Sequence, residues 1–291
     1  MPTTVTRRDS GGSWEMVSRD PHPSLAGQVR RYAGYVEHTT APQRRLQAAY
    51  PGVVVCVSFG ETLRIVDAAG GRTIHRSFTG GLSDAPTYTE HDGEQNGLQI
   101  DLTPLGARAL LGMPMAQLTN RVVELADVLG REAEELVERL YDAGSWERRF
   151  VLLDATLARR LAAAQAPHPA LTHAWSRLRE TEGRLEIGEL CAEVGWSRRH
   201  LAARFREELG LAPKSFARVL RFEHAADLLA RDDARFAEIA YDCGYCDQAH
   251  LNRDFRQFAG TSPGDYVGRL LPGGGVAADV TFVQDASALA A

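Results

Sequence analysis

The chain has 291 residues, with 33 Lys+Arg against 38 Asp+Glu and a formal net charge of −5. This length suffices for two domains, and an overall acidic charge neither requires nor forbids a nucleic-acid partner, because binding needs only local basic charge. The first residues lack the apolar run of a signal peptide, and no long uncharged apolar stretch predicts a membrane span. With four cysteines suited to a reducing compartment, we expect a cytoplasmic protein without a membrane partner.

The N-terminal half, residues 21–165, reads as short strands followed by helices. The first 20 residues are polar with Gly and Ser, and we expect them to be loosely ordered. Strands are expected at 53–59, 63–67, 73–78 and 98–102, and helices at 105–111, 125–141 and 146–164. The order predicts an α+β chain whose first domain is a small β-barrel or sandwich with trailing helices.

Few residues of this half suggest chemistry. His38, His75 and His91 lack the close His-x-His plus Glu spacing of a metal-binding barrel, so we expect no metal site. Cys56 lies within an apolar strand that disfavours its thiolate, which argues against a catalytic nucleophile. We expect no catalytic residue and no cofactor.

Two features of this half leave alternatives open. Tyr88, Glu90 and His91 are expected in a loop, where they either line an effector pocket or form plain surface. An apolar stripe on the helix expected at 125–141 either forms a dimer face or covers the sheet. Its members are Val128, Leu129, Ala133, Leu136, Val137 and Leu140.

After a linker at 166–169, a short unit occurs twice with an offset of 49 to 50 residues. The matched pairs are Gly195 and Gly244, His200 and His250, Leu201 and Leu251, Phe205 and Phe255, Gly210 and Gly260, and Pro213 and Pro263. The offset grows by one after the glycine, so the second turn is one residue longer. In the first unit, apolar residues with helical spacing precede Gly195, and Ser197 suits the N-cap of a second helix. This layout predicts a helix-turn-helix.

The second helix of each unit has a polar free face. In the first unit this face holds Arg198, Arg199, His200, Ala202, Ala203 and Arg206, and in the second Gln248, Ala249, His250, Asn252, Arg253 and Arg256. Arg, Gln and Asn are the side chains that read guanine and adenine edges in the major groove. A pair of core-packing helices is the plain alternative, and the duplication argues against it.

Apolar residues between Pro213 and Leu229 predict a long helix that joins the two units. The segment from about Pro169 to Leu271 resembles the DNA-binding domain of the AraC/XylS family of bacterial transcription regulators. The motif that carries the resemblance is Ile239-Ala240-x-x-Cys243-Gly244-Tyr245, His250-Leu251-x-x-x-Phe255-Arg256, Gly260-x-x-Pro263-x-x-Tyr266. It implies a seven-helix domain at 170–271 whose two recognition helices enter successive major grooves, about 34 Å apart.

The resemblance implies partners as well as a fold. They are double-stranded DNA, a small-molecule effector held by a cupin-like N-terminal domain, a second copy of the chain and, for an activator, RNA polymerase. A constitutive DNA binder whose first domain only dimerises is one alternative, and a DNA-tethered enzyme is another.

Three further expectations concern the C-terminal part. Lys214 and Ser262, at helix starts, are expected to contact phosphates. Cys243 and Cys246 form a Cys-x-x-Cys, which reads either as a redox or zinc element or, as we favour, as helix packing. In the tail at 272–291, residues 280–284 alternate like a strand that either adds to an edge of the N-terminal sheet, packs at the domain junction or frays.

Overall fold

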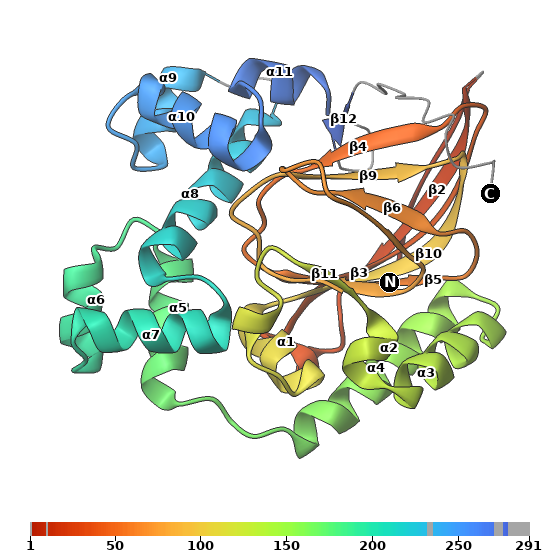
Figure 1. Ribbon diagram of the computed structural model, residues 1–291, viewed down its shortest axis with the longest axis horizontal. Helices are drawn as coiled ribbons and strands as arrows, with labels where there is room; N and C mark the ends of the chain where they lie inside the picture. The colour runs from red at the N-terminus through yellow and green to blue at the C-terminus, as the bar shows by residue number, and fades with distance from the viewer. Residues whose placement is uncertain (1, 10, 232–234, 271–275, 279–291) are drawn as a thin grey trace, which may run out of the picture.

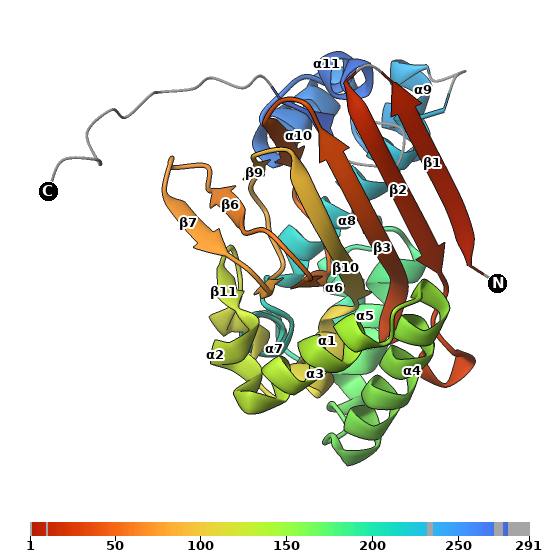
Figure 2. The same cartoon turned by 90° about the vertical axis from the view of Figure 1, so that its right-hand side faces the viewer.

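The computed structural model describes residues 2–9, 11–231, 235–270 and 276–278. They form a β-barrel with helices against one side, and an all-helical domain that runs along another side of the barrel (Figures 1 and 2). The predicted α+β class, with strands first and helices after them, is confirmed.

The barrel is built from two antiparallel sheets. The seven-stranded sheet has the order β1-β2-β3-β10-β5-β8-β11, and the five-stranded sheet has the order β12-β4-β9-β6-β7. The strands are β1 (Thr3–Asp9), β2 (Gly12–Arg19), β3 (Val29–Thr39), β4 (Gln43–Gln47), β5 (Val53–Ser58), β6 (Leu63–Val66), β7 (Arg72–His75), β8 (Phe78–Gly80), β9 (Thr87–His91), β10 (Glu94–Leu102), β11 (Val122–Glu124) and β12 (Val276–Ala277).

The outer face of the larger sheet is apolar because alternate residues of two central strands point the same way. In the register of β10 with β5, Leu98 lies opposite Val57, Ile100 opposite Val55, and Leu102 opposite Val53. All six side chains are buried. This face is covered by helices, so burial of these side chains fixes which side of the sheet the helices occupy.

The helices of the first domain are α1 (Pro104–Leu111), α2 (Leu125–Leu129), α3 (Arg131–Asp142) and α4 (Trp146–Ala163), with short 3-10 turns η1 (Pro23–Leu25) and η2 (Met115–Gln117). The helix expected at 125–141 is interrupted at Gly130, whose φ is 59°. Ala133, Leu136 and Leu140 are buried. The apolar stripe therefore covers the sheet, and its buried members are not available as a dimer face.

Three expectations for this domain are wrong. The first 20 residues are not loosely ordered over their described part, because β1 and β2 form a hairpin that pairs with β3. The strand expected at 73–78 is two strands, β7 and β8, which belong to different sheets. Tyr88, Glu90 and His91 lie on strand β9 and not in a loop.

The described part of the C-terminal domain contains the seven helices that the resemblance implies. They are α5 (Pro169–Glu180), α6 (Ile187–Val194), α7 (Arg198–Leu209), α8 (Pro213–Leu229), α9 (Phe236–Asp242), α10 (Gln248–Ala259) and α11 (Pro263–Gly268). Within residues 2–9, 11–231, 235–270 and 276–278, no helix is long and apolar enough to cross a membrane.

The two domains are in contact along their length. Helix α7 packs on η2 and α1, Arg108 Nε donates to Glu208 at 2.7 Å, and Thr119 Oγ1 donates to the Gly210 carbonyl at 2.9 Å. Near the other end of the barrel, the Ala49 amide donates to the Phe258 carbonyl at 2.7 Å.

A short segment beyond α11 returns to the barrel. Strand β12 pairs antiparallel with the edge strand β4, so that Val276 lies opposite Leu46 (Figure 1). The strand expected at 280–284 lies outside the described residues. The described part of the tail nevertheless adds to the sheet of the first domain, a few residues before the predicted position.

Candidate nucleic-acid interface

Each repeated unit is a helix-turn-helix with defined caps. In the first, α6 ends at Gly195, whose φ of 68° is a left-handed conformation that favours glycine. The Ser197 hydroxyl then caps α7 by accepting from the His200 amide at 3.2 Å. In the second, Gly244 has φ 75°, and the Asp247 carboxylate accepts from the His250 amide at 2.6 Å.

The additional residue of the second turn is visible in the structure. The first turn has Gly195 and one residue before its N-cap, whereas the second has Gly244, Tyr245 and Cys246 before its own. Both turns still place an aromatic ring against a histidine of the next helix. Trp196 meets His200 edge-on with ring centroids 4.6 Å apart, and Tyr245 meets His250 at 5.0 Å.

This contact between turn and helix gives His200 and His250 a role that sequence reasoning missed. Each histidine packs against the aromatic ring of the turn, in addition to its place on the free face. The signal was present in the sequence, because in both copies an aromatic residue follows the glycine and a histidine directly precedes the leucine.

The predicted free faces are exposed even though the N-terminal domain is docked. On α7, Arg198, Arg199, His200, Ala203 and Arg206 are exposed and Ala202 is half-buried; on α10, Gln248, Ala249, Arg253 and Arg256 are exposed, and His250 and Asn252 are half-buried. The opposite faces pack inside, since Leu201, Phe205, Leu251 and Phe255 are fully buried.

Helix α8 fixes α7 and α10 relative to each other. Phe216 of α8 contacts Phe205 of α7 with ring centroids 6.3 Å apart, and Phe222 of α8 contacts Phe255 of α10 at 4.8 Å. Arg218 of α8 adds ion pairing, because its guanidinium donates to the buried Asp254 of α10 at 2.6 Å and to Gln257 at 2.7 Å.

Arginines of this domain differ in whether the fold pairs them with an acid. Arg177, Arg204 and Arg218 are paired with Glu193, Glu208 and Asp254, respectively. By contrast, the arginine side chains of the free faces have no ion pair or hydrogen bond to any residue of the described chain. These are Arg198, Arg199, Arg206, Arg253 and Arg256. The interface therefore presents charge that the fold itself does not neutralise.

Two residues at helix starts were predicted to contact phosphates, and they differ in availability. Lys214, in the first turn of α8, is exposed and its ammonium has no partner among the described residues. The Ser262 hydroxyl accepts from the Asp265 amide at 3.2 Å and donates to the Asp265 carboxylate at 2.6 Å. A phosphate at Ser262 would have to compete with that carboxylate.

The Cys-x-x-Cys is divided between core and surface. Cys243 is buried and Cys246 is exposed. Burial raises the pKa of the Cys243 thiol to about 11, and the nearby carboxylates of Glu182 and Asp242 act in the same direction. This thiol is therefore protonated at neutral pH, as suits a packing residue rather than a reactive one.

The proposed effector residues of the first domain are held by other side chains. Arg44 lies over the ring of Tyr88, 4.3 Å from its centroid, and also pairs with Glu90 at 3.4 Å. His91 is buried with its Nε2 atom 3.5 Å from Glu37. Burial also raises the pKa of the Cys56 thiol, which agrees with the expectation for that strand.

Comparisons with known sequences match the C-terminal part. A family model described as a helix-turn-helix domain covers residues 190–269. An uncharacterised HTH-type transcriptional regulator of Staphylococcus aureus is 36% identical over 84 residues, which are 29% of this chain and 11% of that protein. The HTH-type transcriptional regulator ArgR of Pseudomonas aeruginosa is 28% identical over 182 residues, 62% of this chain and 52% of that protein. The match therefore spans a minor part of the first relative and about half of the second.

Solved structures give weaker likenesses that extend over more of the chain. ToxT from Vibrio cholerae O395 aligns with 78% of this chain and 96% of its own, with a TM-score of 0.45 at 10% identity. A transcriptional regulator from Chromobacterium violaceum with an AraC-type DNA-binding domain aligns with 35% of this chain and 91% of its own, with a TM-score of 0.32 at 27% identity.

Proposed function

We propose that the chain is a sequence-specific DNA-binding regulator of transcription whose C-terminal domain is of the AraC type, and the helix-turn-helix model that matches residues 190–269 supports this. Its recognition helices are α7 and α10. Arg199 and Arg206 read the first major groove, and Gln248, Asn252 and Arg253 read the second.

The observation that carries the proposal is the unpaired arginine set on these two helices. An exposed guanidinium without an acidic neighbour keeps all its donors for a ligand, and its fork matches guanine O6 and N7 or a phosphate. The chain has a net charge of −5, so this concentration of unpaired cations is local. We expect affinity to depend on these few contacts and not on bulk attraction.

Helix α8 supports reading of successive grooves, because it joins the two helix-turn-helix units as one rigid element. Helix α8 has 17 residues, which at 1.5 Å per residue is about 25 Å of rigid rod. Its aromatic contacts hold α7 near one end and α10 further along. Such a rod suits two recognition helices that meet one face of a duplex about one turn apart.

Lys214 is the phosphate contact that we retain. It lies at the positive end of the α8 dipole, next to backbone amides that the helix leaves free. We also propose Ser262 as a phosphate contact, because it lies at the start of α11. There the Asp265 carboxylate competes with a phosphate for the Ser262 hydroxyl.

We further propose that a small molecule bound by the N-terminal domain changes DNA binding. The support is the direct contact of that domain with the reading half, through Arg108 and Glu208 on α7 and through Arg30 and Glu223 on α8. A constitutive binder, whose first domain only dimerises, would need no such contact with α7.

The test is selection of binding sites from a double-stranded DNA library with a random region, using the purified full chain. We expect an enriched motif with two elements whose centres are about 10–10.5 base pairs apart. Sequences no different from the input library would overturn the proposal, and an enriched motif with one element would overturn the two-groove arrangement.

A further inference from the structure

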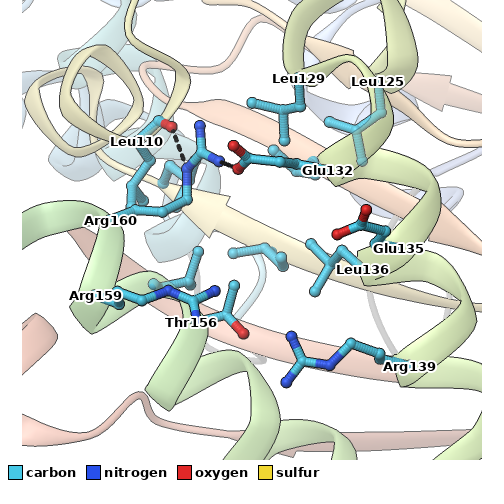
Figure 3. A pocket seen from close by; sticks show the side chains of 14 residues that line it. Leu110, Leu125, Leu129, Glu132, Glu135, Leu136, Arg139, Thr156, Arg159 and Arg160 are labelled. Carbon is cyan, nitrogen blue, oxygen red and sulfur yellow. Dashed lines mark hydrogen bonds and ion pairs between the residues drawn. The ribbon is translucent and has the colours of Figure 1, made fainter. Parts of the chain in front are cut away.

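A cavity of about 340 Å³ opens between the outer face of the large sheet and helices α1–α4 (Figure 3). Its volume lies within the range of small-molecule sites. Strands β5 and β10 supply apolar side chains, and every one of the four helices adds leucine. Val55, Ile100, Leu110, Leu129, Leu136 and Leu157 represent this lining.

The polar residues of the cavity come from α3 and α4. Arg160 is neutralised within the fold, because it pairs with Glu132 and its Nε atom donates to the Leu110 carbonyl at 2.9 Å. Arg139 and Arg159 are exposed, and no described residue forms an ion pair or hydrogen bond with either side chain. Figure 3 shows their guanidinium groups on either side of Thr156.

Glu135 is the remaining acid of the cavity. Once the Arg160–Glu132 pair is set aside, the lining holds two cations and one anion, so it carries one uncompensated positive charge. Protein interiors usually pack without voids, and apolar space left unfilled costs stability. An apolar chamber with free guanidinium groups beside it is therefore suited to a ligand with an apolar body and an anionic head.

We propose that this cavity is a binding site for an amphipathic monocarboxylate. The apolar body lies on the leucines and on the outer face of β5 and β10. The carboxylate lies between Arg139 and Arg159, with the Thr156 hydroxyl as a third donor. Each guanidinium can donate two parallel hydrogen bonds to a carboxylate, which an alcohol of the same shape cannot accept in the same way.

The cavity has a direct mechanical connection to the first recognition helix. Leu110 of α1 lines the cavity and its carbonyl accepts from Arg160. Two residues earlier on the same helix, Arg108 donates to Glu208 of α7 at 2.7 Å. A ligand that repositions α1 therefore acts on α7 through this ion pair; the regulatory meaning of that link rests on the proposed function, whereas the binding site does not.

Binding is tested by isothermal titration calorimetry on the full chain, with decanoate as the probe and 1-decanol as its neutral counterpart. We expect decanoate to bind with one-to-one stoichiometry and 1-decanol to bind at least tenfold more weakly. The double variant Arg139→Gln, Arg159→Gln should lose at least tenfold in decanoate affinity. Arg148→Gln, an exposed arginine of α4 outside the cavity, is the matched control and should bind as wild type.

Three results would each overturn the site. These are no binding of decanoate to the wild type, equal binding of 1-decanol, and unchanged decanoate affinity in the double arginine variant. Because both arginines are exposed, their replacement should leave the fold intact, which the circular dichroism spectrum of each variant checks.

The link to α7 is tested without DNA, so its outcome is independent of the proposed function. Saturating decanoate should slow amide exchange in α1 (residues 104–111) and change it in α7 (residues 198–209). In Arg108→Gln, the effect on α1 should remain and the effect on α7 should be lost. Exchange in α7 that does not respond to decanoate in the wild type would overturn the link.

Discussion

Arg199 lies on the free face of α7, and Arg253 lies on the free face of α10. Neither side chain has an ion pair or hydrogen bond within the described part of the fold. Arg218 in the same domain shows the contrast, because Asp254 and Gln257 accept from it and fix it in place. A side chain that is paired within the fold stabilises the domain. An exposed side chain without a partner can form a favourable ion pair or hydrogen bond only with a ligand. This difference at the scale of single residues separates the proposed DNA-reading face from the packing face.

Replacing Arg199 or Arg253 by alanine should weaken binding to the selected DNA site by about 1–3 kcal/mol, the worth of a bidentate base contact. Base preference should relax at one position of the matching element and remain elsewhere. Fluorescence anisotropy on the selected site and its single-base variants measures both effects. The control is Arg148→Ala in the first domain, and wild-type affinity and preference in both reading variants would remove the assignment.

His91 allows a prediction about pH. Burial lowers its pKa below the ordinary value near 6.5, although the nearby Glu37 acts in the opposite direction. As the pH falls below about 6.5, the unfolded chain binds a proton that the folded chain resists, so the free energy of unfolding falls.

The measurement is denaturant unfolding at pH 7.5 and pH 5.5. The wild type should lose more stability between these conditions than His91→Gln, whatever the absolute stability of that variant. His38→Gln, whose side chain is 60% exposed, should behave as the wild type does. An equal pH dependence in wild type and His91→Gln would show that His91 titrates freely.

At the scale of elements, each helix-turn-helix depends on a glycine in a left-handed conformation. Gly195 has φ 68°, and a Cβ atom there would meet nothing within 4 Å. The cost of Gly195→Ala is therefore conformational alone, about 1–2 kcal/mol. Gly264, in α11, also has open space and no positive φ, so Gly264→Ala should be neutral or stabilise the protein by up to about 1 kcal/mol.

Thermal or denaturant unfolding of the two glycine variants gives the comparison. Equal effects of the two substitutions would show that the left-handed turn is not what constrains position 195. A loss at position 195 together with a neutral result at position 264 supports the backbone requirement.

The start of α8 makes a prediction about salt. Lys214→Ala should weaken binding to all DNA sequences by a similar factor, because a phosphate contact carries no base information. The slope of log affinity against log salt should become shallower by about 0.9. A loss confined to the selected site would contradict a phosphate role for Lys214.

Elements with one apolar face were predictable from the sequence, and others were not. In residues 53–58 and in the helices of the C-terminal domain, apolar residues have the spacing of a buried strand or of an amphipathic helix. Strand β3 was missed because it buries a charged residue, Glu37, which breaks the alternation expected of a buried face. The hairpin β1–β2 was missed because its first strand is an exposed edge, stabilised by backbone pairing that leaves no apolar signal.

The candidate site shows the same division. The free faces of α7 and α10 follow from helical spacing once the glycines and caps are located. The cavity of the first domain could not be predicted, because Arg139 and Arg159 lie on different helices and Val55 and Ile100 on different strands. Only the tertiary arrangement brings these four residues to one place.

At the scale of the whole molecule, the first domain contacts both helix-turn-helix units of the second. Arg108 binds α7 near one end of the barrel, and the Ala49 amide binds the end of α10 near the other. The C-terminal domain nevertheless contains a hydrophobic core, in which Leu178, Leu201 and Phe255 are fully buried. We therefore expect residues 166–291 to fold without the barrel, as a helical circular dichroism spectrum of that fragment would show.

Strand β12 gives a more specific test of the contact between the domains, because two neighbouring amides at its end donate to different domains. The Ala277 amide donates to the Arg269 carbonyl at 2.8 Å within the C-terminal part, and the Ala278 amide donates to the Arg44 carbonyl of β4 at 3.1 Å. In the full chain both amides should exchange slowly, since Val276 beside them is buried. In the fragment 166–291, Ala278 should lose its protection while Ala277 retains part of it.

Amide exchange followed by NMR resolves the two positions. Rapid exchange of Ala278 in the full chain would show that the segment is not paired with the barrel in solution. Retained protection of Ala278 in the fragment would show that pairing with β4 is not what protects it. The expected split between neighbouring amides would instead establish a backbone tie between the two domains, because Ala277 donates to the carbonyl of Arg269 and Ala278 donates to the carbonyl of Arg44 in β4. A displacement of Arg44 at the barrel edge would then reach Arg269 through these two adjacent hydrogen bonds.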